Sequence, residues 1–118
     1  MTLIRGLVLP TRPDLRPMVM GFPTKSSGNL NLEALYLVIG CELVEPIYPA
    51  NEELAPCVMF GDEMGRYRED ARTNMRATRL FSFPYPIVGT VVVFGDNPEL
   101  GVSRDIDDSI INHPTLKG

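Results

Sequence analysis

The chain has 118 residues, 44% of them hydrophobic and 22% charged, and its 15 acidic and 11 basic residues leave a formal net charge of −4. This length accommodates one domain with a modest core and excludes a multidomain enzyme, while the composition excludes wholesale disorder, a collagen-like repeat and a coiled coil. The negative charge argues against a protein whose whole surface attracts nucleic acid. We therefore expect a single domain over residues 1–118.

Metal-binding side chains are few and dispersed. Cys41 and Cys57 form no CxxC pair, and the one histidine, His113, lies in a predicted tail. We therefore expect buried free thiols, no metal site, no cofactor and no disulfide framework. The first apolar stretch is cut by Arg5 and closed by Pro10, too short for a secretory signal or a membrane span, which predicts a cytoplasmic protein.

Two β-rich apolar runs open the chain. Residues 3–9 and 18–22 are predicted strands, and prolines at 17 and 23 place the second at a sheet edge. The proline-rich segment 10–17 is predicted to be a loop, as is the Ser, Gly and Asn stretch that follows the second strand. We treat residues 1–27 as a variable N-terminal part of the domain.

Residues 31–39 carry the signals of an amphipathic helix. Asn31 is a favourable N-cap, Glu33 lies in the first turn and Gly40 can end the helix. The apolar side chains recur at the spacing that puts one helix face against a core: Leu32, Leu35, Tyr36 and Ile39. This segment is predicted to be the main helix.

The middle of the chain alternates short apolar runs with turns. Residues 43–48 and 56–60 are predicted strands, and the glycines and acids of residues 61–65 predict a tight reversal that makes a hairpin over 57–68. Residues 69–80 contain no Gly or Pro and predict a short helix.

The last predicted strand, residues 87–94, is apolar on both faces and is expected at the centre of the sheet. Ser103 is expected to cap a final short helix that ends before Pro114, with a tail at 113–118. Together these elements predict an α+β fold, a mostly antiparallel sheet of about five strands, covered on one side by the helix at 31–39 and bordered by two short helical segments.

The most unusual local feature is a cluster of arginines with an amide and hydroxyls between them. Five arginines lie within fourteen residues: Arg66, Arg68, Arg72, Arg76 and Arg79. Guanidinium forks beside Asn74 and Thr78 suit a phosphate, a carboxylate or a base edge. The alternative is a solvated helix face that Glu69 and Asp70 partly neutralise. We predict ligand binding by Asn74, Arg76 and Thr78, with Arg66 or Arg68 from the preceding hairpin strand.

Asp62 and Glu63 form a second polar feature. Neighbouring carboxylates at a turn could hold a hard cation or act as acid and base, although neighbouring acids at a turn commonly serve the turn itself. Neither a phosphate-binding loop nor a hydrolase motif is present, so no catalytic residue is assigned. Asp62 and Glu63 are instead predicted to belong to the ligand-binding residues. Phe81, Phe83 and Tyr85 alternate and either pack in the core or stack on a ligand.

Several short motifs, in order, resemble a known family. They include the Leu-Glu-Ala-Leu-Tyr run at 32–36, the Asp-Glu-Met-Gly turn at 62–65, the Asn-Met-Arg-Ala-Thr segment at 74–78 and the Ile-Val-Gly of 87–89. Over about residues 28–112 the chain resembles a small domain family of unknown function that recurs in phage, prophage and plasmid genes, often actinobacterial. The resemblance implies a mobile-element setting and no particular reaction.

From these features we predict a non-enzymatic, phage-encoded accessory protein of the host cytoplasm. Its expected partner is a host factor or a small anionic, nucleotide-like ligand, and its expected role includes countering host defence. Binding to nucleic acid or a membrane is not expected, and self-association stays open. The alternative is a small enzyme acting on a nucleotide or nucleic acid through Asp62 or Glu63, with Arg76 stabilising charge.

Overall fold

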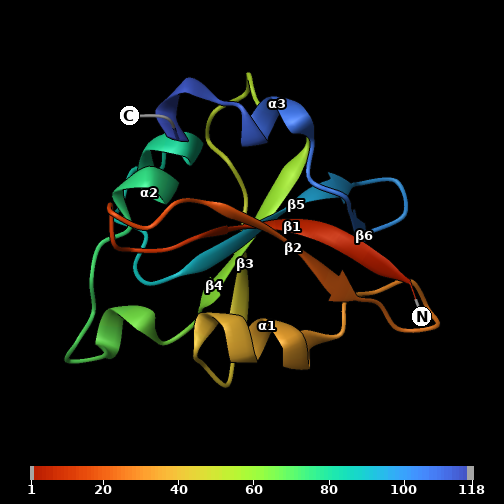
Figure 1. The fold of residues 1–118 in the computed structure, drawn as a ribbon, viewed down its shortest axis with the longest axis horizontal. Coiled ribbons are helices and arrows are strands. Elements are labelled where there is room, and N and C mark those ends of the chain that lie inside the picture. Colours follow the sequence, from red (N-terminus) through yellow and green to blue (C-terminus); the bar gives the residue numbers. More distant parts are fainter. Residues whose placement is uncertain (1, 117–118) are drawn as a thin grey trace.

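The computed structural model describes residues 2–116 and contains an antiparallel sheet with helices on both faces (Figure 1). Its strands are β1 (Leu3–Leu9), β2 (Met18–Pro23), β3 (Val44–Ile47), β4 (Cys57–Asp62), β5 (Val91–Asn97) and β6 (Val102–Arg104). Its helices are α1 (Leu32–Ile39), α2 (Met75–Phe81) and α3 (Asp108–Ile111), with 3-10 turns at Gly65–Tyr67 and Pro114–Leu116. The predicted α+β class is confirmed. None of the helices within residues 2–116 is long and apolar enough to cross a membrane.

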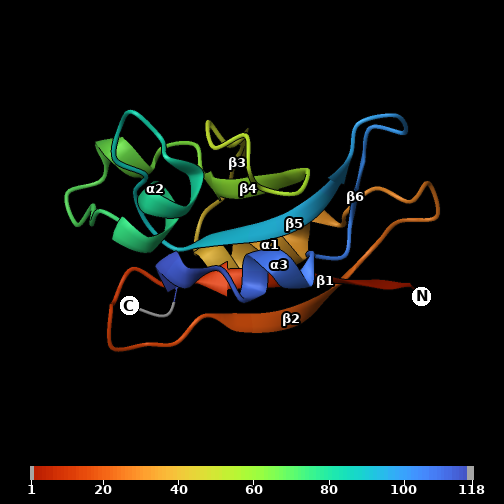
Figure 2. The ribbon, with the colours of Figure 1, turned by 90° about the horizontal axis from the view of Figure 1, so that it is seen from above.

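The six strands form one sheet whose main order is β2-β1-β5-β4-β3, with β6 added to β5 (Figure 2). All pairs are antiparallel. The predictions of β2 at an edge and of the most apolar strand at the centre are both confirmed. That central strand begins at Val91 rather than at residue 87, because Gly89 has a positive φ of 82° and breaks the extended backbone.

Side chains alternate between the two faces of the sheet, and this alternation divides the core into two layers. Leu9, Met59 and Val93 pack with α2 and α3, whereas Val58 and Phe94 pack with α1. Side chains of successive strand residues point to opposite faces, so apolar residues at both odd and even positions require cover on both sides. α1 therefore covers one face as predicted, but α2 and α3, predicted to border the sheet, form a second layer on its other face.

The first helix confirms its sequence signals. The Asn31 side chain accepts a hydrogen bond from the Glu33 backbone N–H at 3.1 Å, and Gly40 adopts a left-handed φ of 80° that ends the helix. Leu35 is fully buried. Local cap chemistry and apolar spacing agree here with the tertiary packing.

Of the two elements predicted after β4, the hairpin is wrong, and the short helix is confirmed with a later start. There is no hairpin over 57–68, because β4 pairs with β3 and β5 and the following residues form the 3-10 turn at Gly65–Tyr67. The predicted helix over 69–80 begins only at Met75, since Asn74 caps it and Thr73 forms a β-bridge with Val88. Arg66 and Arg68 therefore lie at a 3-10 turn rather than on a strand.

The C-terminal part also differs from the prediction. Ser103 lies in β6, and the N-cap of α3 is Asp107, whose side chain accepts from the Ser109 backbone N–H at 2.9 Å. The predicted tail at 113–118 contains the 3-10 turn Pro114–Leu116, whose Leu116 packs against the core. Residues 117–118 lie outside the described part of the chain.

Candidate functional site

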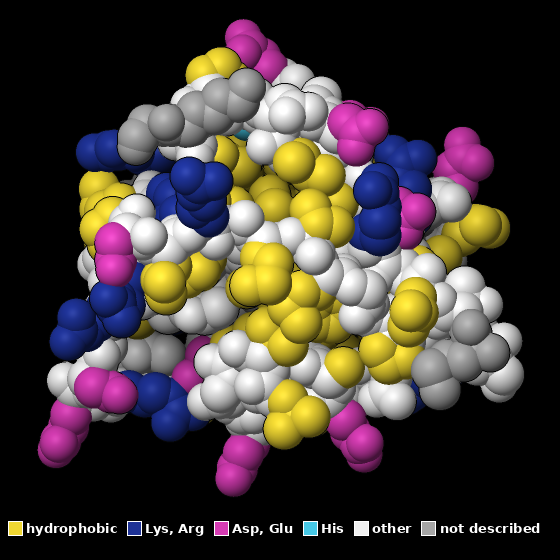
Figure 3. Space-filling view, in the orientation of Figure 1, with side chains coloured by type: hydrophobic (Ala, Val, Ile, Leu, Met, Phe, Trp, Pro, Cys, Tyr) yellow, Lys and Arg dark blue, Asp and Glu magenta, His cyan; other side chains and the backbone are white. Residues whose placement is uncertain are grey.

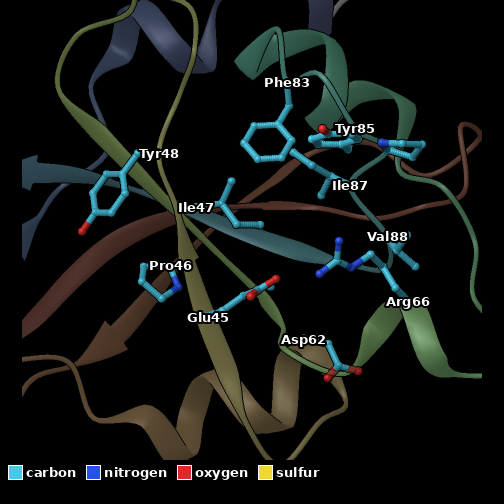
Figure 4. Close-up of a pocket in the computed structure, with 12 residues that line it drawn as sticks. Glu45, Pro46, Ile47, Tyr48, Asp62, Arg66, Phe83, Tyr85, Ile87 and Val88 are labelled. Carbon is cyan, nitrogen blue, oxygen red and sulfur yellow. The ribbon is translucent and has the colours of Figure 1, made fainter.

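A cavity of about 320 Å³ opens between the β3 edge of the sheet and the segment 83–88 (Figure 4). Glu45 and Ile47 project into it from β3, and Arg66 faces them from the 3-10 turn. Phe83 and Tyr85 contribute aromatic walls. The cavity thus combines an apolar floor with two anionic side chains, Glu45 and Asp62, and one cationic side chain, Arg66.

The local sequence explains why the sheet is hollowed here. Glu45 and Ile47 are two residues apart on β3, so both lie on the same face of the sheet. Glu45 pairs with Gly61 of β4, which has no side chain to fill the space beside it. A Cβ at Gly61 would meet only the Val91 and Ile47 side chains, at 3.4 and 3.6 Å.

Arg66 is the cation of this cavity. Its side chain is exposed, and its guanidinium points toward the space above Ile47 and Glu45 (Figure 4). Within residues 2–116, no hydrogen bond or ion pair engages that guanidinium or the Glu45 carboxylate. Both charged groups are therefore free to meet a ligand.

The guanidinium of Arg68, two residues later, is by contrast paired with a carboxylate. Its Nε donates to the Asp62 carboxylate, whose side chain is only 9% exposed and whose other oxygen accepts from the Met64 backbone N–H at 2.9 Å. The Asp62 hydrogen bond and charge raise the pKa of Arg68. Asp62 thus organises the turn at the border of the cavity, whereas Glu63 points into solvent and engages the fold through its backbone N–H, 3.0 Å from the Leu43 carbonyl.

Asn74 is fully buried and acts inside the fold. Its Nδ2 donates to the carbonyls of Leu9 at 2.8 Å and Gly89 at 3.0 Å, and its Oδ1 accepts from the Ala77 backbone N–H at 3.1 Å. One side chain therefore ties the end of β1, the turn before β5 and the start of α2 together.

Thr78 and Arg76 also bind backbone groups. The Thr78 hydroxyl donates to the Asn74 carbonyl at 2.8 Å and accepts from the Ile87 N–H at 2.9 Å. The Arg76 guanidinium donates to three carbonyls of the proline-rich loop 10–17, namely those of Pro10, Arg12 and Leu15 at 2.7, 3.0 and 2.6 Å. The arginine thereby holds the N-terminal loop against α2.

The residues predicted to bind a ligand therefore do not lie on one face: Asn74 is buried, and Arg66 and Arg76 line different cavities. Ligand binding by them stays a prediction. Asn74 is buried because this helix cap also satisfies the carbonyls of the β1 end and of the turn before β5, so its donors and acceptor face inward. Asp62 and Arg76, the pair invoked in the alternative enzymatic hypothesis, line different cavities.

The three aromatic residues Phe81, Phe83 and Tyr85 do not share one environment. Phe81 lies in the core, whereas Phe83 and Tyr85 line the cavity. Sequence reasoning missed Glu45 and Tyr48, the other polar members of the lining. The only local signal for Glu45 is a lone acid within an apolar strand, which by itself is also typical of an exposed strand face.

The thiols and acids do not gather into a metal site. Among residues 2–116, no group of three or more His, Cys, Asp or Glu side chains has ligand spacing. Cys41 and Cys57 are free, and burial together with the charge of Asp96 raises the pKa of Cys57 to about 12. At neutral pH that thiol is protonated and unreactive.

Comparison with known proteins yields one match. No curated protein and no solved structure matches the chain. A family model matches residues 4–115, which extends the family into the N-terminal segment that supplies β1 and β2. Since this match spans nearly the whole domain, the chain belongs to the family described as Domain of unknown function (DUF3846).

Proposed function

We propose that the protein is a non-enzymatic binding domain that holds a small anionic, nucleotide-like ligand in the cavity beside β3. The observation that carries the proposal is the free Arg66 guanidinium on the wall of an aromatic-lined cavity. A guanidinium fork binds a phosphate or carboxylate through two parallel hydrogen bonds, and an aromatic ring offers a face to a planar base.

Glu45 narrows the class of ligand. Its carboxylate accepts hydrogen bonds from hydroxyl or amino groups and repels a second anion, so the cavity suits a compact molecule with one anionic end and donors at the other. Its volume of about 320 Å³ lies at the small end of ligand pockets, which favours mononucleotide size or smaller.

The resemblance to phage, prophage and plasmid domains supplies the biological part of the proposal. A mobile element can encode a small protein that acts in the host cell. Such a protein can sequester a host ligand in a binding cavity without catalysing a reaction. Removal of a signalling or defence nucleotide is the role that this combination supports. Expression in an actinobacterial host and mass spectrometry of the released small molecules would identify the ligand.

The experiment compares Arg66→Ala with Arg104→Ala, a matched loss of an exposed arginine on β6, by calorimetric titration with a panel of mononucleotides. We expect Arg66→Ala to weaken binding roughly ten- to hundredfold, the value of a charge-assisted hydrogen bond, and Arg104→Ala to leave it unchanged. Bound nucleotide should also raise the 260/280 absorbance ratio, since the chain has no Trp and four Tyr. Equal affinities of the two variants, or a wild-type protein that binds no nucleotide and releases none, would overturn the proposal.

A further inference from the structure

A second groove lies at the opposite edge of the sheet. We name it the β2 groove: it has a volume of about 660 Å³ and runs between β2, the proline-rich loop, α2 and the C-terminal 3-10 turn. Its apolar lining includes side chains that remain substantially exposed, Met75 at 49%, Leu15 at 45% and Val19 at 40%. Figure 3 shows apolar side chains across the face on which β2 lies, with cationic and acidic side chains around them.

The charge of the β2 groove is opposite to that of the whole chain. Its described lining contains Arg16, Arg76 and Arg79 and no acidic residue, whereas the net charge is −4. Carbonyl oxygens satisfy the donors of Arg76 without neutralising its charge. That charge reaches beyond the groove: the pKa of nearby Asp14 is lowered mainly by its hydrogen bond with Arg12, with Arg76 among the further causes.

The strand that borders the groove is itself unpaired on one side. β2 ends the strand order, so within residues 2–116 β1 is the only strand paired with it, and the Pro23 carbonyl at its end accepts from the Asn31 backbone N–H at 3.0 Å. In an antiparallel strand alternate residues direct their N–H and C=O groups away from the neighbour, and such an edge accepts an added strand. The sequence of β2, Met-Val-Met-Gly-Phe-Pro, contains none of the charged side chains that commonly block edges.

We propose that β2 and its groove bind an extended segment of a partner protein by strand addition, and that this segment carries apolar side chains flanked by carboxylates. Added strand backbone would pair with β2, and alternate side chains would lie over Val19, within reach of Arg16 and Arg79. A second copy of this chain fits less well, because its own β2 brings no carboxylate to meet those arginines. The inference is independent of the ligand proposed for the cavity at β3.

The test uses fluorescence anisotropy with a labelled, capped peptide, Glu-Glu-Val-Val-Val-Glu-Glu, and the matched peptide with lysine in place of glutamate. We expect the acidic peptide to bind, the basic peptide not to bind, and added salt to weaken the complex. The double variant Arg16→Glu/Arg79→Glu should lower affinity at least about tenfold, while Arg104→Glu, the same reversal outside the groove, should preserve it.

Backbone pairing is tested on the wild-type protein with two acidic peptides, N-methylated on alternate residues in opposite registers. Strand addition predicts that one of them loses at least about tenfold in affinity while the other binds, since only one set of amides faces β2. Equal binding of both, equal binding of acidic and basic peptides, or no binding of either would overturn the proposal. A concentration-dependent dimer that blocks the peptide and dissociates in Val19→Glu would assign the groove to a second copy instead.

Discussion

Replacement of Asn74 by Ala should be among the most destabilising single changes in this domain. The variant removes three side-chain hydrogen bonds at a fully buried position, two to the carbonyls of Leu9 and Gly89 and one from the amide of Ala77. At about 1 kcal/mol for each of the three bonds, and up to about 3 kcal/mol where the partner is left unsatisfied, the loss is about 3–9 kcal/mol. A domain of this kind has a total stability of about 5–15 kcal/mol.

The matched control is Asn31→Ala. Asn31 is the same residue type in the same N-cap position of α1, but its side chain makes a single hydrogen bond, to the Glu33 amide, at a partly exposed site. Loss of such a cap costs about 1 kcal/mol. Comparing the two losses of unfolding free energy therefore distinguishes two contributions. Both variants lose a helix cap, but only Asn74→Ala also loses the hydrogen bonds that join β1, the Gly89 turn and α2.

Urea unfolding followed by circular dichroism measures both variants. With a slope of about 2 kcal/mol per molar, Asn74→Ala should lower the midpoint by about 1.5 M or more, and Asn31→Ala by about 0.5 M. Midpoints that fall equally, or an Asn74→Ala midpoint equal to that of the wild type, would refute the structural role and return Asn74 to the candidate ligand-binding residues.

Asn74→Asp adds a pH test of the same network. The carboxylate retains the acceptor for the Ala77 amide, but it faces the Leu9 and Gly89 carbonyls, which are also acceptors. Burial and this repulsion should raise its pKa in the folded state above the unfolded value of about 3.9. The penalty is then complete above the raised pKa and diminishes as the pH falls toward 3.9, a dependence that Asn74→Ala should not show.

Three further predictions follow from the contacts of single side chains. Arg68→Ala should lower the melting temperature more than Arg66→Ala in a thermal scan, because only Arg68 is paired with the nearly buried Asp62; equal melting temperatures would contradict this. Arg76→Ala should accelerate amide hydrogen exchange in residues 11–16 with little change in global stability, because its guanidinium holds that loop against α2. Arg76→Lys should restore the slow exchange only in part, because lysine keeps the charge but lacks the planar fork. Unchanged exchange in Arg76→Ala would refute this role. Because burial raises the pKa of Cys57 to about 12, its thiol ionises at lower pH in the unfolded chain than in the folded protein. Its contribution to stability should therefore fall as pH rises from about 9 to 12, by up to about tenfold in the folding equilibrium per pH unit, and Cys57→Ala should show a correspondingly smaller slope.

Much of the secondary structure could be predicted from local signals. The Asn31 cap, the apolar spacing around Leu35 and the left-handed Gly40 specify α1 because each acts within a few residues of the helix it bounds. The run before Gly95 is apolar at both odd and even positions, so both faces of the strand must be covered. This pattern indicates a central strand, as the structure shows. Signals of this range require no knowledge of distant partners.

The candidate site depended on contacts between residues far apart in the chain. The sequence places Asn74, Arg76 and Thr78 in one polar segment, yet their partners include Leu9, Pro10 and Ile87, which only the closed sheet brings near. The tertiary structure likewise decided which arginine stays free, because Arg68 lies next to the Asp62 carboxylate whereas Arg66 faces a cavity formed by β3 and the segment 83–88. Spacing along the chain determines which side chains share a local face, and the pairing of distant strands determines which of them remain available to a ligand.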